Sequence, residues 1–199
     1  MKRNFVHMAR LPGTSYIKFI VVIATALMTI IIFNNLGTDL KSIQNRNGAL
    51  FFIALTIALN SVQHVTLIFP DERPVFLREV NNNMYAVTAY FFAKIGSEFP
   101  ISVLTPLLYG SIVYFAIGLS TVAISKFFIF LGILVLLYLS AGSYALILSS
   151  LLADKQLAVT LTPLLVIPFM LFAGFFVAKD VIPKYLLEIH YLSFFKYGY

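Results

Sequence analysis

The sequence contains no cysteine. The chain therefore forms no disulfide, offers no thiolate nucleophile and provides no cysteine ligand for a metal. Charged side chains are scarce as well, because Asp, Glu, Lys and Arg make up 11% of the 199 residues, against about 25% in an ordinary soluble domain. These two absences exclude a disulfide-stabilised fold and thiol chemistry, and they argue against a water-soluble domain.

The chain has long apolar runs instead, since 60% of its residues are hydrophobic. These runs continue for many residues without the polar stripe that a helix on the surface of a soluble protein carries. The net charge of +6 would fit a nucleic-acid partner if the basic residues formed a patch, but they flank the apolar runs. Composition therefore predicts an all-α, multi-pass integral membrane protein in a lipid bilayer, with no nucleic-acid partner.

Apolar spans are predicted at about residues 16–33, 49–69, 99–119, 127–153 and 157–177. A helix needs about 20 residues to cross the hydrocarbon core of a bilayer. Three other segments are expected: a cytoplasmic leader or connecting helix at 1–15, a charged cytoplasmic loop with a short amphipathic helix at 70–83, and an aromatic-rich external loop at 178–199. The sequence thus predicts one membrane domain over its whole length.

Charges around the first span predict its orientation. Lys2, Arg3, Arg10 and Lys18 flank that span, and the cytoplasmic ends of membrane helices are enriched in basic residues. No small-residue cleavage site of a signal peptide is evident, so the span is expected to stay uncleaved. We therefore expect a cytoplasmic N-terminus, in either the plasma membrane or an organelle membrane.

Several short motifs follow one another in a characteristic order. The segment 42–52 resembles the start of the second membrane helix in the G subfamily of ABC transporters, which includes the White eye-pigment type and the sterol and multidrug half-transporters. The segment 72–79, Glu-Arg-Pro-Val-Phe-Leu-Arg-Glu, is similar to the loop pattern that comes next in that subfamily. Other positions also match in the subfamily's order: 10–12, Tyr90, Ala93, Lys94, Glu98, Pro100, Tyr114, Gly118, 171–175 and 191–198.

The resemblance implies the membrane domain of a half-transporter that pairs with a second half-transporter, as a homodimer or a heterodimer. Such a protein exports lipid-like, sterol-like or other amphipathic molecules by alternating access. ATP and Mg²⁺ would bind a nucleotide-binding domain outside these residues, because the sequence has no G-x-x-x-x-G-K-[ST] loop. This chain itself is expected to be no enzyme and to hold no cofactor or metal.

A second interpretation is a truncated membrane protein that transports nothing and instead binds and modulates full-length half-transporters. The sixth membrane helix of the subfamily is not found in these residues, which favours this interpretation. An intramembrane enzyme is disfavoured, because no span contains a pair of carboxylates, a Ser-Lys pair or a His-Glu-x-x-His run.

By resemblance, the charged loop contains the coupling helix that docks on the nucleotide-binding domain. A short rigid helix between two spans can pass on a domain movement as a rigid-body shift. Any cytoplasmic loop carries charge, but the order of the motifs favours coupling. The residues expected to pair with the leader and the ATP-hydrolysing domain are Glu72, Arg73, Arg78 and Glu79.

Polar residues within the second span predict a substrate-binding face. Thr56, Asn60 and Gln63 lie on one helical face at three- and four-residue steps, with Leu59 beside them. In the resembling subfamily the second and fifth membrane helices line the substrate cavity. The residues of the fifth span that would join this face are Leu164, Ile167 and Met170. The alternative is that the polar groups form hydrogen bonds between helices and bind no ligand.

Two aromatic residues and two histidines complete the candidates. Phe175 and Phe176 lie where the subfamily has a hydrophobic gate between cavity and exit, although aromatic residues are also common at membrane interfaces. His64 has no acidic neighbour within its span, which favours a packed or interfacial histidine over a proton relay or a metal ligand. His190 is expected outside the hydrocarbon and is given no functional role.

Overall fold

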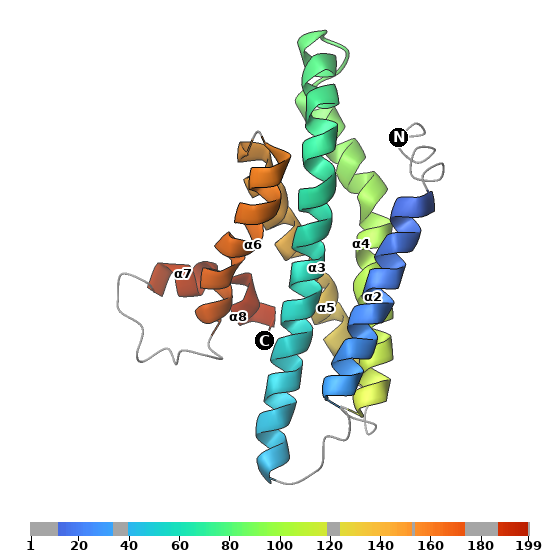
Figure 1. Ribbon diagram of the computed structural model, residues 1–199, viewed down its shortest axis with the longest axis vertical. Helices are drawn as coiled ribbons and strands as arrows, with labels where there is room; N and C mark the ends of the chain where they lie inside the picture. The colour runs from blue at the N-terminus through green and yellow to red at the C-terminus, as the bar shows by residue number, and fades with distance from the viewer. Residues whose placement is uncertain (1–11, 34–39, 119–123, 153, 174–186, 199) are drawn as a thin grey trace.

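The computed structural model of the chain describes residues 12–33, 40–118, 124–152, 154–173 and 187–198. Regular secondary structure in these residues is entirely helical (Figure 1). The helices are α2 (Pro12–Ile32), α3 (Leu40–Asn81), α4 (Val87–Ile117), α5 (Ile124–Leu151), α6 (Lys155–Leu171), α7 (Leu187–Leu192) and α8 (Phe194–Gly198). The predicted all-α class is confirmed.

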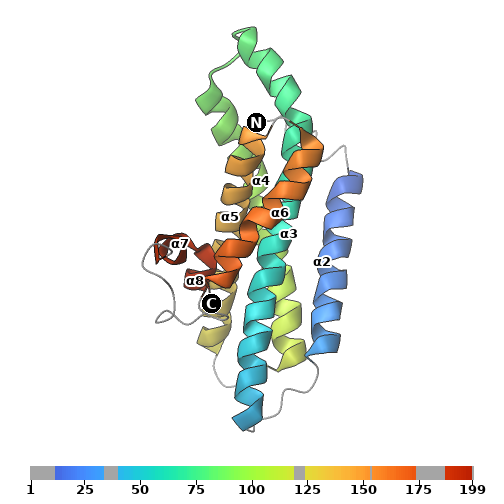
Figure 2. The ribbon, with the colours of Figure 1, turned by 60° about the vertical axis from the view of Figure 1, so that its left-hand side comes forward.

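The long helices form an elongated bundle with α3 running along its whole length (Figures 1 and 2). The most extensive contact of α3 is with α5, and α2 packs mainly against α4. The short helices α7 and α8 lie beside the end of α6, and α8 also contacts α5. The bundle therefore has α3 and α5 at its centre and α2 at its periphery.

The helices have the length and surface of membrane spans. Three of them, residues 44–81 of α3, α4 and α5, are long and apolar enough to cross a bilayer, and two shorter apolar stretches cover 18–32 and 155–171. Large apolar side chains also point outward, such as Ile31 at 76% exposure and Leu136 at 68%. An outer surface of this kind is stable in lipid rather than in water. The chain is an all-α membrane domain.

Helix α3 is longer than the predicted second span. Its 42 residues rise by about 63 Å, roughly twice the thickness of a hydrocarbon core. The segment 70–83, predicted as a charged loop with a short amphipathic helix, is helical up to Asn81, but as the last turns of α3, even though Pro70 and Pro74 lie inside it. Each proline removes one backbone donor, but side chains of α4 and the backbone carbonyl of Leu152 in the α5–α6 connection bond to these turns and hold them in place. The helix is followed by a turn at Asn83, whose φ of 53° is one that asparagine tolerates.

Other helix ends also differ from the predicted spans. Helix α4 begins at Val87, ahead of the apolar span predicted from 99, because the helix includes a polar segment that hydropathy does not count as membrane. Helix α6 ends at Leu171, before the predicted limit at 177. The predicted external loop at 178–199 contains two short helices, α7 and α8, and Phe195 of α8 is fully buried.

The contact between α3 and α5 is unusually close. The hydroxyl of Ser61 donates a 2.7 Å hydrogen bond to the carbonyl oxygen of Tyr138. A Cβ atom at Gly142 would lie 2.9 Å from the same hydroxyl, so a glycine is what lets the two backbones approach at this level. Ile57 and Ala141, which are fully buried, pack around this point.

Candidate functional site

A buried lysine lies at the centre of the candidate site. Lys94 of α4 is 6% exposed, and its ammonium group forms ion pairs with Glu72 of α3 and with Glu98, one turn further along α4. The Lys94 Nζ lies 2.9 Å from the Glu98 Oε1. The hydroxyl of Tyr90 also donates to Glu72, at 3.2 Å. These four residues, here called the Lys94 cluster, join the last turns of α3 to the first turns of α4.

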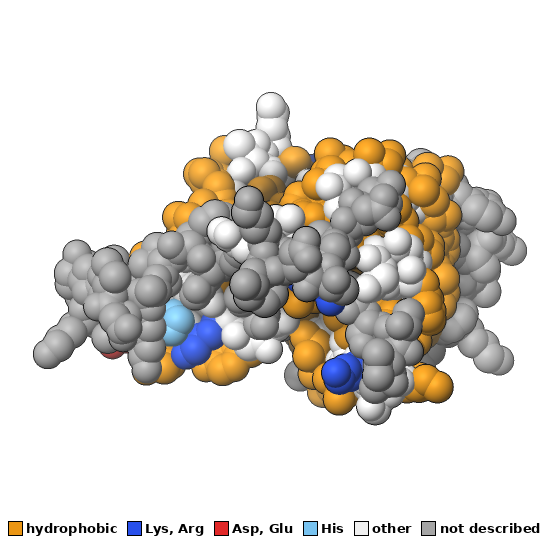
Figure 3. All heavy atoms as spheres, turned by 90° about the horizontal axis from the view of Figure 1, so that it is seen from below, with side chains coloured by type: hydrophobic (Ala, Val, Ile, Leu, Met, Phe, Trp, Pro, Cys, Tyr) orange, Lys and Arg blue, Asp and Glu red, His pale blue; other side chains and the backbone are white. Residues whose placement is uncertain are grey.

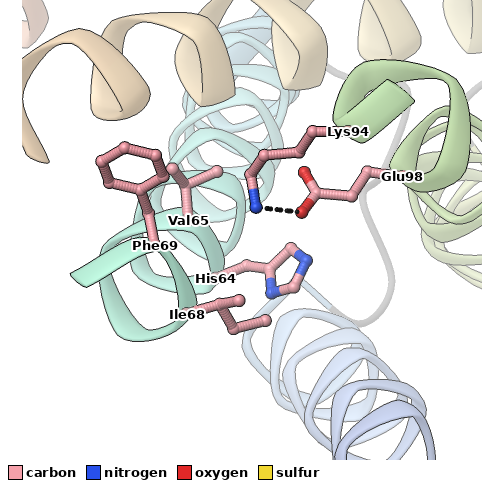
Figure 4. Close-up of a pocket in the computed structure, with 6 residues that line it drawn as sticks. All are labelled: His64, Val65, Ile68, Phe69, Lys94 and Glu98. Carbon is pink, nitrogen blue, oxygen red and sulfur yellow. Dashed lines mark ion pairs between the residues drawn. The ribbon is translucent and has the colours of Figure 1, made fainter. Parts of the chain in front are cut away.

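The Lys94 cluster borders a small cavity. Figure 4 shows Lys94 and Glu98 of α4 facing His64 of α3 across it. The cavity has a volume of about 10 Å³, which is enough for about one water molecule. His64 contacts the ammonium group of Lys18 on α2 through its Nε2 atom. The polar region therefore connects α2, α3 and α4 at one end of the bundle.

Two more contacts join the end of α3 to the α5–α6 connection. Arg73 donates a 3.3 Å hydrogen bond to the carbonyl oxygen of Leu152. The Lys155 Nζ lies 2.5 Å from an Asp71 carboxylate oxygen. Next to it, the Asp154 side chain caps the start of α6 by accepting a backbone N–H at 3.0 Å. A movement of the end of α3 would therefore also move α4 and the α5–α6 connection.

Most of the predicted coupling residues have partners within this chain. Glu72 and Arg73 bond to α4 and to the α5–α6 connection, as described above. Glu79 accepts a 2.6 Å hydrogen bond from the Tyr85 hydroxyl across the α3–α4 turn, and Arg78 is exposed. The expected contacts with the leader lie outside the described residues, which begin at 12.

Breaking the Asp71–Lys155 pair should change stability little. The two side chains are 62% and 47% exposed, so water screens their attraction. The substitution Asp71→Asn is expected to lower the free energy of unfolding by no more than about 1 kcal/mol, measured by denaturant unfolding of the purified protein. A larger loss would mean that the pair is shielded from water in the assembled protein.

One of the predicted cavity residues forms a hydrogen bond between helices. The Asn60 amide donates to the Thr25 hydroxyl of α2 at 3.5 Å. The Thr56 hydroxyl instead donates a 2.8 Å bond to the carbonyl oxygen of Phe52 in its own helix. Asn60 therefore faces α2, and the bonding between helices that the sequence left open as an alternative is present there.

The other predicted cavity residues divide into two groups. Leu59 and Met170 are partly buried and pack against the core, whereas Gln63, Leu164 and Ile167 are exposed. None of these residues lines the cavity beside Lys94 or the larger hollow between α3 and α5 described below. The three exposed residues lie on the outer surfaces of α3 and α6, where a second chain can reach them.

The predicted gate residues Phe175 and Phe176 lie outside the described residues. The chain just before them is held by α7, because the His190 Nδ1 atom lies 2.6 Å from the carbonyl oxygen of Phe172. His190 is 4% exposed and is thus packed inside the protein, although the sequence placed it in an external loop.

The Lys94 cluster was not predicted as a unit from the sequence. Lys94 and Glu98 are four residues apart, a spacing that brings charges together on a helix and is visible in the sequence. Glu72 is separated from Lys94 by 22 positions, so only the fold reveals that pairing. Among the described residues, no three His, Cys, Asp or Glu side chains come together as a metal site. The contacts of the cluster hold helices in fixed positions.

Known sequences resemble this chain over most of its length. The sequence profile of the family described as ABC-2 type transporter matches residues 1–199. ABC transporter G family member 24 of Dictyostelium discoideum is 34% identical over 199 residues, covering 99% of this chain and 17% of that protein. ABC transporter G family member 4 of Arabidopsis thaliana is 34% identical over 169 residues, covering 84% of this chain and 29% of that protein.

Protein white of Drosophila melanogaster is 29% identical over 196 residues, which are 98% of this chain and 28% of that protein. The chain therefore spans 17% to 29% of the length of these three relatives.

Proposed function

This chain belongs to the ABC-2 type transporter family, as a membrane domain like those of the G family of ABC transporters, and from this premise we propose that it is the membrane-spanning part of a half-transporter for amphipathic molecules. Family membership implies a role in transport. The cargo is lipid-like or sterol-like, and alternating access presents its site first to the inside and then to the outside. ATP and Mg²⁺ bind a separate nucleotide-binding domain, and this domain docks at the end of α3 on the cytoplasmic side.

Helix α3 is one continuous helix that carries both predicted sites, and this observation supports the proposal most strongly. The substrate-face residues 56–63 lie in its middle and the coupling residues 72–79 lie near its end. Because packed helices move as rigid bodies, a shift applied at the charged end also moves the substrate face. The Lys94 cluster and the contact from Arg73 to Leu152 make α4 and the α5–α6 connection follow that shift.

The substrate cavity forms between two chains in this proposal. Gln63 is exposed on α3, while Leu164 and Ile167 are 57% and 44% exposed on α6. Apolar walls with a few polar groups suit an amphipathic organic molecule. An ion would instead need rings of charged groups or carbonyl oxygens. By the resemblance to the G subfamily, Phe175 and Phe176 form the gate above this cavity.

Reconstitution tests the proposal. The chain, joined to its ATP-hydrolysing domain, is placed in liposomes, and the movement of a fluorescent phospholipid or sterol analogue is followed after ATP is added. The expected result is movement that requires ATP hydrolysis and stops with a non-hydrolysable analogue. A protein that binds a full-length half-transporter and changes its transport rate, but moves no cargo itself, would instead be a modulator.

Shortening Ile167 to alanine should change which cargo is preferred. Loss of part of a cavity wall weakens binding of the cargo that fits it, and the ratio of transport rates for two sterol analogues of different side-chain length should shift roughly ten-fold. Ile147→Ala is the matched control, because Ile147 is 61% exposed on the outer surface of α5. An unchanged ratio in both variants would place Ile167 outside the cavity.

A further inference from the structure

A larger hollow lies at the opposite end of the bundle from Lys94, between α3 and α5. Its volume is about 260 Å³. Its walls are apolar and come from the two helices: Leu50, Ala54, Ile129, Phe130, Ile133 and Leu134. Lys126 lines it near the start of α5, while Gly198 of α8 lines it further along, next to Leu137. We call this hollow the α3–α5 groove.

Lys126 lines one end of the α3–α5 groove, and Arg46 of α3 lies about one helical turn before Leu50, which also lines it. Ser61 of α3 lies against Tyr138 and Gly142 of α5, which come 77 and 81 positions later in the chain. Helices α3 and α5 run in the same direction and rise by about 1.5 Å per residue, so this offset also holds near their starts (Figures 1 and 2). By this offset Arg46 lies level with Lys126.

Neither basic residue has an acidic partner among the described residues. The ion pairs found among the described residues all lie at the opposite end of the bundle, around Lys94 and Lys155. The Nε atom of Arg46 is buried without a hydrogen-bond partner from these residues, and Lys126 is exposed. Where Figure 3 shows described side chains at this end of the bundle, blue basic ones lie among orange apolar ones. Two basic side chains without an ion pair to a described carboxylate give this end a positive charge, which attracts an anion.

We propose that the α3–α5 groove binds one anionic phospholipid. Its phosphate lies between Arg46 and Lys126, and an acyl chain follows the apolar walls toward Gly198. Arginine and lysine form charge-assisted hydrogen bonds with phosphate, and the apolar walls match an acyl chain. The volume is just below the roughly 300–1,000 Å³ of ordinary ligand pockets, which suits a thin chain rather than a bulky ring system.

This bound lipid is distinct from the cargo. None of the seven predicted cavity residues lines the α3–α5 groove. The proposal therefore stands whether or not the protein exports lipids, and it is tested by binding instead of transport.

Native mass spectrometry of the intact protein tests the proposal. The protein is titrated with phosphatidylglycerol or with zwitterionic phosphatidylcholine, and the dissociation constant of the tightest bound lipid is measured. The Arg46→Gln/Lys126→Gln variant should bind phosphatidylglycerol about ten-fold or more weakly, because two charged contacts are lost. The matched control Arg78→Gln/Lys155→Gln removes two exposed positive charges from the other end and should keep the tight site. Equal weakening in both variants, or none in the first, would overturn the proposal.

A single cysteine distinguishes a lipid from other occupants of the groove. This chain has no cysteine, and Ile129 lines the groove while being 62% exposed. A lipid-soluble maleimide should modify Ile129→Cys in phosphatidylcholine and react several times more slowly in phosphatidylglycerol. Ile147→Cys, on the outer surface of α5, should react equally in both lipids. If Ile129→Cys is unreactive in both, another protein segment or a second copy covers the groove; equal reaction in both likewise overturns the proposal.

Discussion

Replacing Lys94 with methionine is expected to lower the free energy of unfolding by about 1.5–3 kcal/mol. The ammonium group is buried between Glu72 and Glu98, whose side chains are 43% and 29% exposed, so its loss leaves two partly screened carboxylates close together without a counter-charge. Methionine keeps an unbranched apolar side chain of similar length, so the loss comes mainly from the charge. Unfolding of the purified protein followed by circular dichroism should show a midpoint lower by roughly 3–12 °C.

Two further variants show whether burial is the cause. Lys155→Met removes the same group from an ion pair whose lysine is 47% exposed, and should cost no more than about 1 kcal/mol. Adding Glu98→Gln to Lys94→Met should recover part of the loss, because a neutral amide does not repel the Glu72 carboxylate. If Lys94→Met is no less stable than Lys155→Met, the Lys94 cluster does not hold α3 to α4.

The sequence predicted the helical membrane fold well because apolar runs are a local signal. All the long helices overlap apolar runs that hydropathy detects, but their ends follow other rules. Helix α3 continues through Pro70 and Pro74 because α4 and the α5–α6 connection hold its last turns. Contacts of this kind join residues far apart in the chain, so hydropathy cannot place those helix ends.

The candidate site was predictable only in part, for a similar physical reason. The charges of 71–79 are visible in the sequence, and their concentration marks that end of α3. The partner of Glu72 is Lys94, on the next helix, and a helical wheel does not reveal it. Asn60 shows the same limit, since its polar side chain suits either cargo or another helix, and only the position of Thr25 shows that it reaches α2.

The two ends of the bundle differ in how their charges are satisfied. At the Lys94 end, carboxylates and ammonium groups pair across helices, so this end can transmit a movement as one unit. At the other end, Arg46 and Lys126 have no described carboxylate near them. The proposed lipid site and the proposed docking of an ATP-hydrolysing domain therefore lie at opposite ends of the bundle.

Adding a methyl group at Gly142 is expected to weaken the contact between α3 and α5. The new Cβ would lie 2.9 Å from the Ser61 hydroxyl, which already donates a 2.7 Å bond to the carbonyl oxygen of Tyr138. Gly132 on the same helix has no atom within 4 Å of such a Cβ. Both Gly→Ala changes gain about 1 kcal/mol of helix propensity, so their difference isolates the crowding. Gly142→Ala should be about 1–3 kcal/mol less stable than Gly132→Ala, measured by denaturant unfolding.

A double variant tests whether Ser61 is the atom that is crowded. Ser61→Ala removes the hydroxyl that the new Cβ would meet, at the loss of one hydrogen bond worth about 0.5–1.5 kcal/mol. Combined with Gly142→Ala, it should therefore cost less than the sum of the two single changes, with a coupling of about 0.5–3 kcal/mol. Strictly additive losses would mean that α3 and α5 are further apart at this level than the structure shows.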